Sequence, residues 1–390
     1  MKHLLTALAI LLIAAAHAAA TEHIVRPGEP WSDLGAKLKP GDRVLLAPGS
    51  HVPAAFERVS GTPEQPIVIR PVEDGKLVEI EPKREALKFT DCAHIRVERL
   101  SVKNARRAGI LIESTRPGAS RDISVADVLV TGVSGLAEQS GIVVRGAREV
   151  GIRRSRIENC TGAAVLIEHS ESVTVEDCQL FARSGKPMQR GIGIEGSSAD
   201  IAVRRVFARG PIETGVSVGV ENPPFAVAAD DPPAAPAKPE RPEALARRVD
   251  ILETRMKDVI RPLRIGSCAA LVVRQCTMLD PREEIYEVVA APGGFAPAEA
   301  RILDNLVVWE PGSLRRLSHA EPGARTAGVV LGPNLWWSKE LPTALPLLGP
   351  SENPFLGTVE SAQTLDRDPI LDDKGYPTDP TSMVYGAPRP

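Results

Sequence analysis

Two glutamates end similar apolar segments of the chain, Glu168 in AVLIE and Glu195 in GIGIE. Arg145 ends the related segment GIVVR, and Lys186 and Arg190 lie in the polar stretch RSGKPMQR just before GIGIE. Paired carboxylates can hold a hard cation such as calcium through oxygen ligands. A nearby lysine or arginine can take the proton α to a carboxylate. These residue types are the ones needed to cleave an acidic polysaccharide by β-elimination.

Two other interpretations of the same charges stay open. Carboxylates about 5 Å apart also suit glycoside hydrolysis. Charged side chains that point outward from a strand also form a solvated ladder, in which each opposite-charge pair contributes about 0.2–1 kcal/mol. His169 directly follows Glu168 and is expected to occupy a turn rather than to act in catalysis.

An internal repeat explains how such distant residues become neighbours. Segments with apolar residues at spacing two recur about every 23 to 28 residues. Their first apolar residues are Ile95, Ile123, Val150, Val173 and Ile201. A second series follows them, as GILIE, GIVVR, AVLIE, GIGIE, GVSVG and PLRIG. Each period therefore holds three short strands and no helix. Such strands bury their apolar faces only by pairing with the same strand one coil on, about 4.8 Å away. The sequence predicts an all-β fold, a single-stranded right-handed parallel β-helix (solenoid).

Stacking of the coils places residues of equal offset side by side on the outward face of the second strand series. One outward column is Glu113, Arg145, Glu168, Glu195, Gly219 and Gly266. The column beside it is Leu111, Val143, Leu166, Gly193, Ser217 and Arg264. The expected roles are catalysis for Lys186 and Arg190, substrate binding for Glu113, Arg145 and Arg264, and calcium ligation for Glu168 and Glu195. No other cofactor is expected.

The five cysteines are expected to be small buried residues rather than disulfides. Cys178 and Cys276 share one inward column but lie about three rungs, or about 14 Å, apart. A disulfide needs Cα atoms within about 7 Å.

The chain divides into a leader, a solenoid and a tail. Residues 1–20 have a short basic start, an apolar run and small residues at the end, which predicts a cleaved signal peptide. Residues 21–92 are expected to form an N-terminal cap and the first coils, and residues 93–336 the β-helix. The β-helix is interrupted by a Pro/Ala-rich insertion at 221–244. Residues 337–390 are expected to form an extended Pro-rich tail along the outside of the solenoid.

Three local predictions test this division. Ser32 is expected to cap the N-terminus of a short helix that carries Leu34 and Leu38. The stretch ALARRVDILETRM fits both a helix and a rung, and we favour a rung with a short helical lead-in. Beyond Leu279 we expect one last coil with a long excursion.

Composition narrows the choice of partners. The formal net charge is −3, acidic and basic residues are interspersed, and aromatic residues make up only 4% of the chain. Nucleic acid is therefore not an expected partner, since it requires a basic surface. No segment after the leader could span a bilayer. We expect an exported monomer, secreted or periplasmic, whose partner is a polysaccharide.

The segments LKPGDRVLLAPGSHV and SGTPEQPIVIRP resemble the N-terminal capping region of right-handed β-helix proteins of the pectate lyase-like superfamily, in the style of its chondroitinase B and alginate lyase branch. The repeats from Ile95 to Met278 resemble its β-helix domain, and DRDPILDDKGYPTDPTSMVYG resembles the tail that often follows it. The resemblance implies the fold and not one activity, because the superfamily contains lyases, hydrolases, epimerases and non-enzymes. The catalytic motifs of its polygalacturonase-like hydrolases do not occur on the rungs.

Two classes of function follow. The first is an exported carbohydrate-active protein, a polysaccharide lyase acting on an acidic glycan. The alternative is a non-catalytic glycan-binding or cell-surface scaffold protein. The Pro/Ala-rich insertion adds a third option, a tether to a protein partner.

Overall fold

The computed structural model describes residues 20–81, 84–135, 139–220, 246–290, 295–310, 313–338, 362–364, 368–372 and 376–388. The predicted signal peptide, apart from its last residue, and the predicted insertion at 221–244 lie outside these ranges. Within these ranges, no helix has both the length and the apolar character to cross a bilayer.

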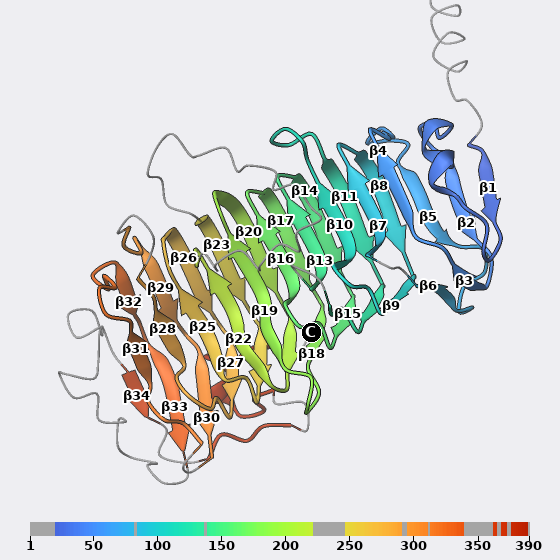
Figure 1. Ribbon diagram of the computed structural model, residues 1–390. Coiled ribbons are helices and arrows are strands. Elements are labelled where there is room, and N and C mark those ends of the chain that lie inside the picture. Colours follow the sequence, from blue (N-terminus) through green and yellow to red (C-terminus); the bar gives the residue numbers. More distant parts are fainter. Residues whose placement is uncertain are drawn as a thin grey trace, which may run out of the picture.

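Three parallel sheets run the length of the molecule and form a right-handed parallel β-helix, as predicted (Figure 1). Sheet A has twelve strands, namely β1 (Glu22–Val25), β2 (Arg43–Leu46), β5 (Ile67–Pro71), β8 (Ala93–Glu98), β11 (Arg121–Ala126), β14 (Arg148–Arg153), β17 (Glu171–Glu176), β20 (Ser198–Arg204), β23 (Ala246–Leu252), β26 (Cys268–Arg274), β29 (Ala300–Leu303) and β32 (Val329–Leu331). Sheet B also has twelve, namely β3 (Gly49–His51), β6 (Val78–Ile80), β9 (Ser101–Lys103), β12 (Leu129–Thr131), β15 (Arg156–Glu158), β18 (Gln179–Phe181), β21 (Phe207–Arg209), β24 (Arg255–Lys257), β27 (Thr277–Leu279), β30 (Leu306–Trp309), β33 (Asn334–Ser338) and β34 (Ala362–Thr364). Sheet C has ten, namely β4 (Ala54–Glu57), β7 (Glu85–Thr90), β10 (Ala108–Glu113), β13 (Ser140–Arg145), β16 (Ala163–Glu168), β19 (Met188–Glu195), β22 (Ile212–Val218), β25 (Arg261–Ile265), β28 (Tyr286–Val288) and β31 (Ser318–Ala320).

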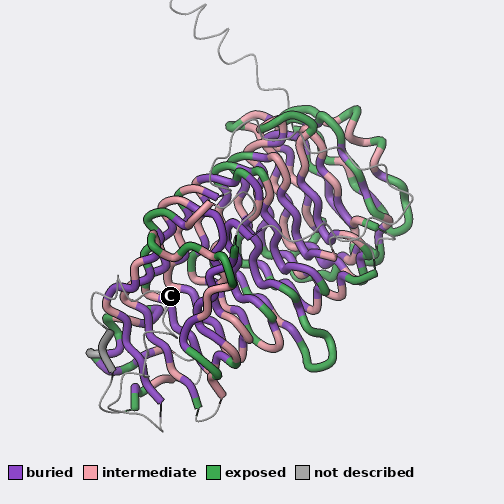
Figure 2. Tube along the Cα trace, turned by 60° about the vertical axis from the view of Figure 1, so that its left-hand side comes forward, coloured by how far each residue is buried: buried purple, intermediate pink, exposed green. Residues whose placement is uncertain are grey.

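The predicted register is confirmed in sheet C, whose strands are the predicted second series. Ile110 pairs with Ile142, which pairs with Val165, and all three are fully buried. Their side chains belong to one apolar core that extends along the solenoid, and the buried residues follow the strands in Figure 2. The favoured rung also forms, because Val249 of β23 pairs with Ile201 of β20. The helical lead-in would fall on residues outside the described ranges.

Residues with a left-handed backbone conformation (positive φ) recur at fixed offsets and shape each coil. One follows every sheet A strand from β8 to β29, and these residues are Arg99, Asp127, Arg154, Asp177, Arg205, Glu253, Gln275 and Asp304. Another lies near the start of the same strands, and these are His94, Asp122, Glu149, Ser172, Asp200, Arg248, Ala270 and Glu299. A left-handed backbone costs about 1–2 kcal/mol for residues with a Cβ, and polar Asp and Asn tolerate it best. Most of these positions are polar, and only Ala270 has an apolar side chain.

Ala270 is therefore the place where glycine should stabilise the fold. Its φ is +55°, and its side chain is half-buried. We expect Ala270→Gly to raise the free energy of unfolding by about 0.5–1 kcal/mol, because glycine adopts this φ without strain. Urea unfolding measures the change. The control is Ala202→Gly in the extended part of β20, which should instead lower the stability.

The inward column at the corner between sheets A and B becomes polar toward the C-terminus. Asn305 and Asn334 are both buried there. The Asn305 side chain donates to the Val273 carbonyl oxygen (3.1 Å) and to Asn334 Oδ1 (2.9 Å). Its Oδ1 accepts a hydrogen bond from the Cys276 amide (2.9 Å). The amide side chains thus satisfy backbone groups of the neighbouring coils.

All five cysteines are buried and free, as predicted. Burial raises the pKa of the Cys178 thiol to about 11 and that of Cys276 to about 12. Such thiols remain protonated and unreactive at neutral pH.

Two local predictions are wrong at the ends of the chain. The short helix is the 3-10 helix η1 (Ser32–Ala36), and Ser32 begins it rather than capping it. The Ser32 hydroxyl instead accepts a hydrogen bond from the Ala55 amide of β4 (3.1 Å). Beyond Leu279 the chain forms more than one last coil: β29 to β31 make one complete coil, β32 and β33 begin another, and β34 pairs with β33 as a further strand of sheet B.

Part of the predicted tail is built into sheet B as the end of β33 and as β34, and the segment at 376–388 packs on the outside of the solenoid. The Arg255 guanidinium lies 3.7 Å from the centre of the Tyr376 ring. Farther on, beyond the short helix α2 (Pro380–Met383), the Ala387 amide donates to Thr277 Oγ1 (2.8 Å). The tail therefore covers the outward side of β24 and β27.

Candidate functional site

Four predicted site residues end consecutive strands of sheet C. Glu113 of β10 pairs in register with Arg145 of β13, Arg145 with Glu168 of β16, and Glu168 with Glu195 of β19. The structure therefore brings together residues that lie in four separate coils. This row is possible because neighbouring parallel strands keep one register, so that residues of equal offset align.

Each carboxylate in this row has a cationic partner. Arg145 donates from Nε (2.8 Å) and contacts through Nη2 (2.6 Å) the same Oε2 of Glu168. Glu195 accepts a hydrogen bond from Arg190, and Glu113 lies 2.7 Å from the Lys88 ammonium. The row is thus a ladder of opposite charges along the C-terminal ends of the sheet C strands.

Glu168 and Glu195 are neighbours, as the predicted calcium ligands must be. Both carboxylates, however, are already bonded to arginines. Calcium takes six to eight oxygen ligands. Within the described ranges, no group of three or more acidic, histidine or cysteine side chains is arranged to hold a metal ion. The pair alone does not make up a calcium site, and calcium binding stays a prediction.

Arg190 lies across the outward face of β19. Its side chain is buried, and its Nη1 lies 2.9 Å from where a Cβ on Gly193 would be. A larger residue at position 193 would therefore displace the guanidinium. Burial lowers the pKa of Arg190 to about 10, and the Glu168 carboxylate partly opposes that shift.

Lys186 lies apart from these carboxylates. It is exposed in the turn that leads into β19, bridged to Arg183 through the backbone. It forms no ion pair with any residue that the structure describes. Its catalytic role stays a prediction.

The N-terminal half of the middle column differs from the expected surface. Leu111 and Val143 point outward but are fully buried, and Leu166 is 3% exposed. They pack against one another with Ala108 and Ala163 in a second apolar cluster. An outward position on this sheet is therefore not always an exposed one, because side chains of adjacent rungs cover each other.

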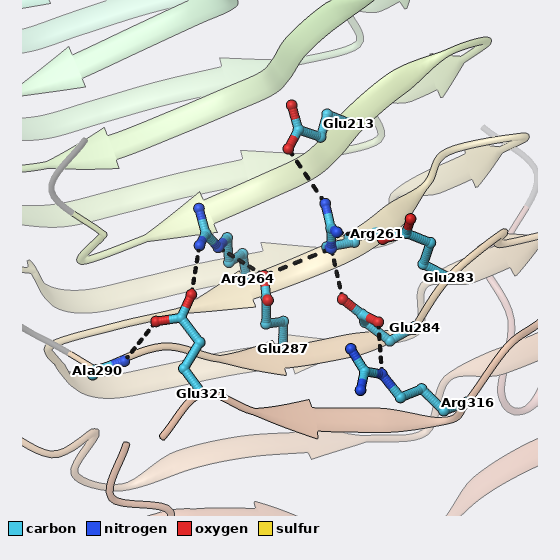
Figure 3. Close-up of polar contacts among 9 residues, drawn as sticks. All are labelled: Glu213, Arg261, Arg264, Glu283, Glu284, Glu287, Ala290, Arg316 and Glu321. Atoms are coloured by element: carbon cyan, nitrogen blue, oxygen red, sulfur yellow. Dashed lines mark hydrogen bonds and ion pairs between the residues drawn. The ribbon is translucent and has the colours of Figure 1, made fainter. Parts of the chain in front are cut away.

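The C-terminal half of the face carries a charge network that the sequence analysis missed (Figure 3). Its central acid is Glu284, which is 1% exposed. Glu284 accepts hydrogen bonds from Arg261 Nε (2.6 Å) and from Arg316 Nε (3.0 Å). Burial raises the pKa of Glu284, but the two guanidiniums outweigh it and hold that pKa below its usual range.

Arg264, a predicted substrate-binding residue, belongs to the same network. Its Nε lies 2.7 Å from Glu287 Oε2, and its Nη2 donates to Glu321 Oε1 (2.9 Å). The other oxygen of Glu321 accepts a hydrogen bond from the Ala290 amide (3.1 Å). The sequence signal that could have revealed Glu287 is the segment EIYEVV, which places it at the Arg264 offset one coil on.

Comparisons with known proteins agree with this architecture. Residues 78–207 match the family described as "Right handed beta helix region". Among solved structures, the A-module of mannuronan C-5 epimerase AlgE4 from Azotobacter vinelandii is similar with a TM-score of 0.50 and 13% identity, covering 76% of this chain and 86% of that chain. An alginate lyase from Paenibacillus sp. str. FPU-7 gives a TM-score of 0.48 and 12% identity, covering 80% and 99%. Pectate lyase Pel9A gives 0.43 and 10%, covering 96% and 97%.

No curated protein matches the sequence significantly. At these identities the structural likeness concerns the fold alone. The chain is a right-handed parallel β-helix protein.

Proposed function

We propose that this chain is an exported, carbohydrate-active protein that binds an acidic polysaccharide along the outward face of sheet C and cleaves it by β-elimination. The observation that carries the proposal is a set of guanidiniums on every second strand of sheet C, Arg145 on β13, Arg190 on β19 and Arg264 on β25, each of which holds a carboxylate. Guanidinium groups match the planar geometry of carboxylates. The rung spacing of about 4.8 Å is close to the size of one sugar unit. The lyases and the epimerase that share the fold support the proposal by analogy only.

The proposed reaction needs one base and one group that neutralises the sugar carboxylate. The base takes the proton from the carbon α to that carboxylate. The β carbon–oxygen bond then breaks, a carbon–carbon double bond forms, and the leaving oxygen takes a proton from the protonated base or from water. Arg190 is the stronger candidate for the base, because burial lowers its pKa to about 10 and Glu195 holds it over Gly193. Lys186 is the second candidate, and no step runs through a metal ion.

The test is turnover on a panel of uronate polysaccharides, with and without added calcium. Unsaturated chain ends absorb ultraviolet light, and we expect that absorbance to grow with the mature protein. Arg190→Ala should reduce the rate by about a hundredfold or more, the usual loss when a general base is removed. Arg154→Ala is the matched control, since Arg154 pairs with Asp127 on the exposed corner of sheet A. A folded protein that releases no unsaturated ends from any substrate would refute the lyase activity.

A second candidate function, non-catalytic glycan binding, is favoured by one observation. The acids Glu168, Glu195 and Glu284 are all bonded to arginines, so their carboxylates are already engaged within the protein. Binding on a glycan array without product formation would support this function. Turnover would exclude it.

A further inference from the structure

Strand β22 forms a gap of small side chains between two arginine-bearing strands. In one outward column, Arg190 pairs in register with Thr214, and Thr214 pairs with Arg261. In the middle column, Gly193 pairs with Ser217, and Ser217 pairs with Arg264. The largest outward side chains at this rung are thus those of its two neighbours.

Ser217 is at the centre of this gap and is unsatisfied. It is 1% exposed, and its hydroxyl has no hydrogen-bond partner among the residues that the structure describes. The buried Nε of Arg190 also lacks a partner. Buried polar groups are nearly always bonded to protein, water or ligand, because leaving one unpaired costs about 1–3 kcal/mol.

Guanidiniums flank the Ser217 hydroxyl on both sides. Arg190 extends over Gly193, which is the register partner of Ser217 on one side. Arg264 is its register partner on the other side, and 27% of the Arg264 side chain is exposed. Neighbouring strands are about 4.8 Å apart, so both cations lie close to the hydroxyl.

The carboxylate partners of these arginines lie elsewhere. Glu195 is at the end of β19, and Glu287 and Glu321 belong to the coils beyond β25. They hold the guanidiniums from outside the gap. Glu213, the acid of β22, lies at the start of that strand and pairs with Arg261 (3.3 Å), and the residues between Arg190 and Arg264 in the middle column, Gly193 and Ser217, carry no charge. One anion above Ser217 would contact both guanidiniums.

We propose that Ser217 and Arg264, with Arg190 opposite, form a subsite for the carboxylate of a single uronic acid unit. This subsite rests on the proposed function and specifies where the acidic sugar is bound. The Ser217 hydroxyl and the Arg264 guanidinium fit one planar carboxylate, and Arg190, the proposed base, faces it from the opposite side. The α carbon of that unit would then lie on the Arg190 side. A methyl ester at the same position would lose both charge-assisted contacts.

The decisive variant is Ser217→Ala, which removes one hydroxyl and no charge. Calorimetric titration with oligogalacturonate and oligomannuronate should show about tenfold weaker binding, the loss of one hydrogen bond to a charged group. Ser267→Ala is the matched control, because Ser267 is also buried with an unpaired hydroxyl but follows β25 at a corner of the coil. It should bind like the wild type. Methyl-esterified oligogalacturonate should bind the wild type and Ser217→Ala equally weakly.

Thermal stabilisation by monomeric galacturonate, by glucuronate and by inorganic sulfate at equal ionic strength separates the outcomes. If the uronates stabilise the wild type and not Ser217→Ala, the subsite is supported. This holds even if no polysaccharide is cleaved and the lyase proposal fails. If the wild type and Ser217→Ala bind uronates equally well, the subsite is overturned. If both proteins cleave polysaccharide with the same KM, the subsite is also overturned, but the proposed function stands. Stabilisation by sulfate alone, or by none of the three, also overturns it.

Discussion

Replacement of Asn305 by alanine is expected to lower the free energy of unfolding by about 3–5 kcal/mol. The side chain of Asn305 serves three buried groups at once, the Cys276 amide, the Val273 carbonyl and the Asn334 side chain. Alanine would leave these groups unpaired in a part of the core that water does not reach. Leaving three buried groups unpaired costs more free energy than their three hydrogen bonds contribute, on balance, to the stability of the native protein.

Urea unfolding of the wild type and Asn305→Ala measures this difference. The control is Asn159→Gly, which removes an asparagine side chain that accepts one exposed hydrogen bond, from the Arg183 amide, and keeps a left-handed backbone. It should change the stability by no more than about 0.5 kcal/mol. A loss below about 1 kcal/mol for Asn305→Ala would show that the amide column contributes little.

Removal of Arg261 should have a comparable effect through charge. Arg261 contacts four acids, and two of them, Glu284 and Glu287, are almost fully buried. We expect Arg261→Met to destabilise the protein by about 3–5 kcal/mol at neutral pH, the usual cost of leaving buried charge without its partner. Arg316 remains bonded to Glu284 and keeps the loss from growing larger.

The effect of Arg261→Met should depend on pH. In the wild type the pKa of Glu284 is held below its usual range, so its ion pairs stabilise the fold above that range and are lost as the pH falls. In the variant the same carboxylate is easier to protonate. The difference in stability between the two proteins should therefore shrink between neutral pH and about pH 4.

Unfolding curves at several pH values test this dependence. Arg154→Met is the control, because the exposed Arg154–Asp127 pair should contribute less than about 1 kcal/mol. A deficit for Arg261→Met that stays constant with pH would indicate lost packing rather than lost charge.

The repeat made most of the solenoid predictable from the sequence. A strand alternates inward and outward residues, and a stack requires matched volumes at equal offsets. Ile110, Ile142 and Val165 satisfied both conditions, which also placed Glu168 beside Glu195. The cysteine prediction followed from the same geometry, since residues of one column cannot approach more closely than the rungs allow.

The charge network escaped prediction because it lies where the repeat becomes irregular. The chain between β27 and β28, and between β30 and β31, no longer follows the spacing of the earlier coils, so Glu284 and Glu321 had no aligned equivalents. Periodicity also says whether a side chain points outward but not whether a neighbour covers it. Leu111 and Ser217 were therefore expected on the surface and are buried.

The pairing of β20 with β23 has a practical consequence for engineering. Asp200 and Arg248 are separated by 48 positions in the chain, whereas Arg145 and Glu168 of two adjacent coils are separated by 23. The strand register continues in both places, so the pairing of the described strands does not depend on the number of residues between β22 and β23. Doubling the length of a flexible connection costs only about 0.6 kcal/mol of closure entropy. This junction is a natural fusion point, at which a reporter or a whole foreign module can be spliced into the protein without disturbing its framework.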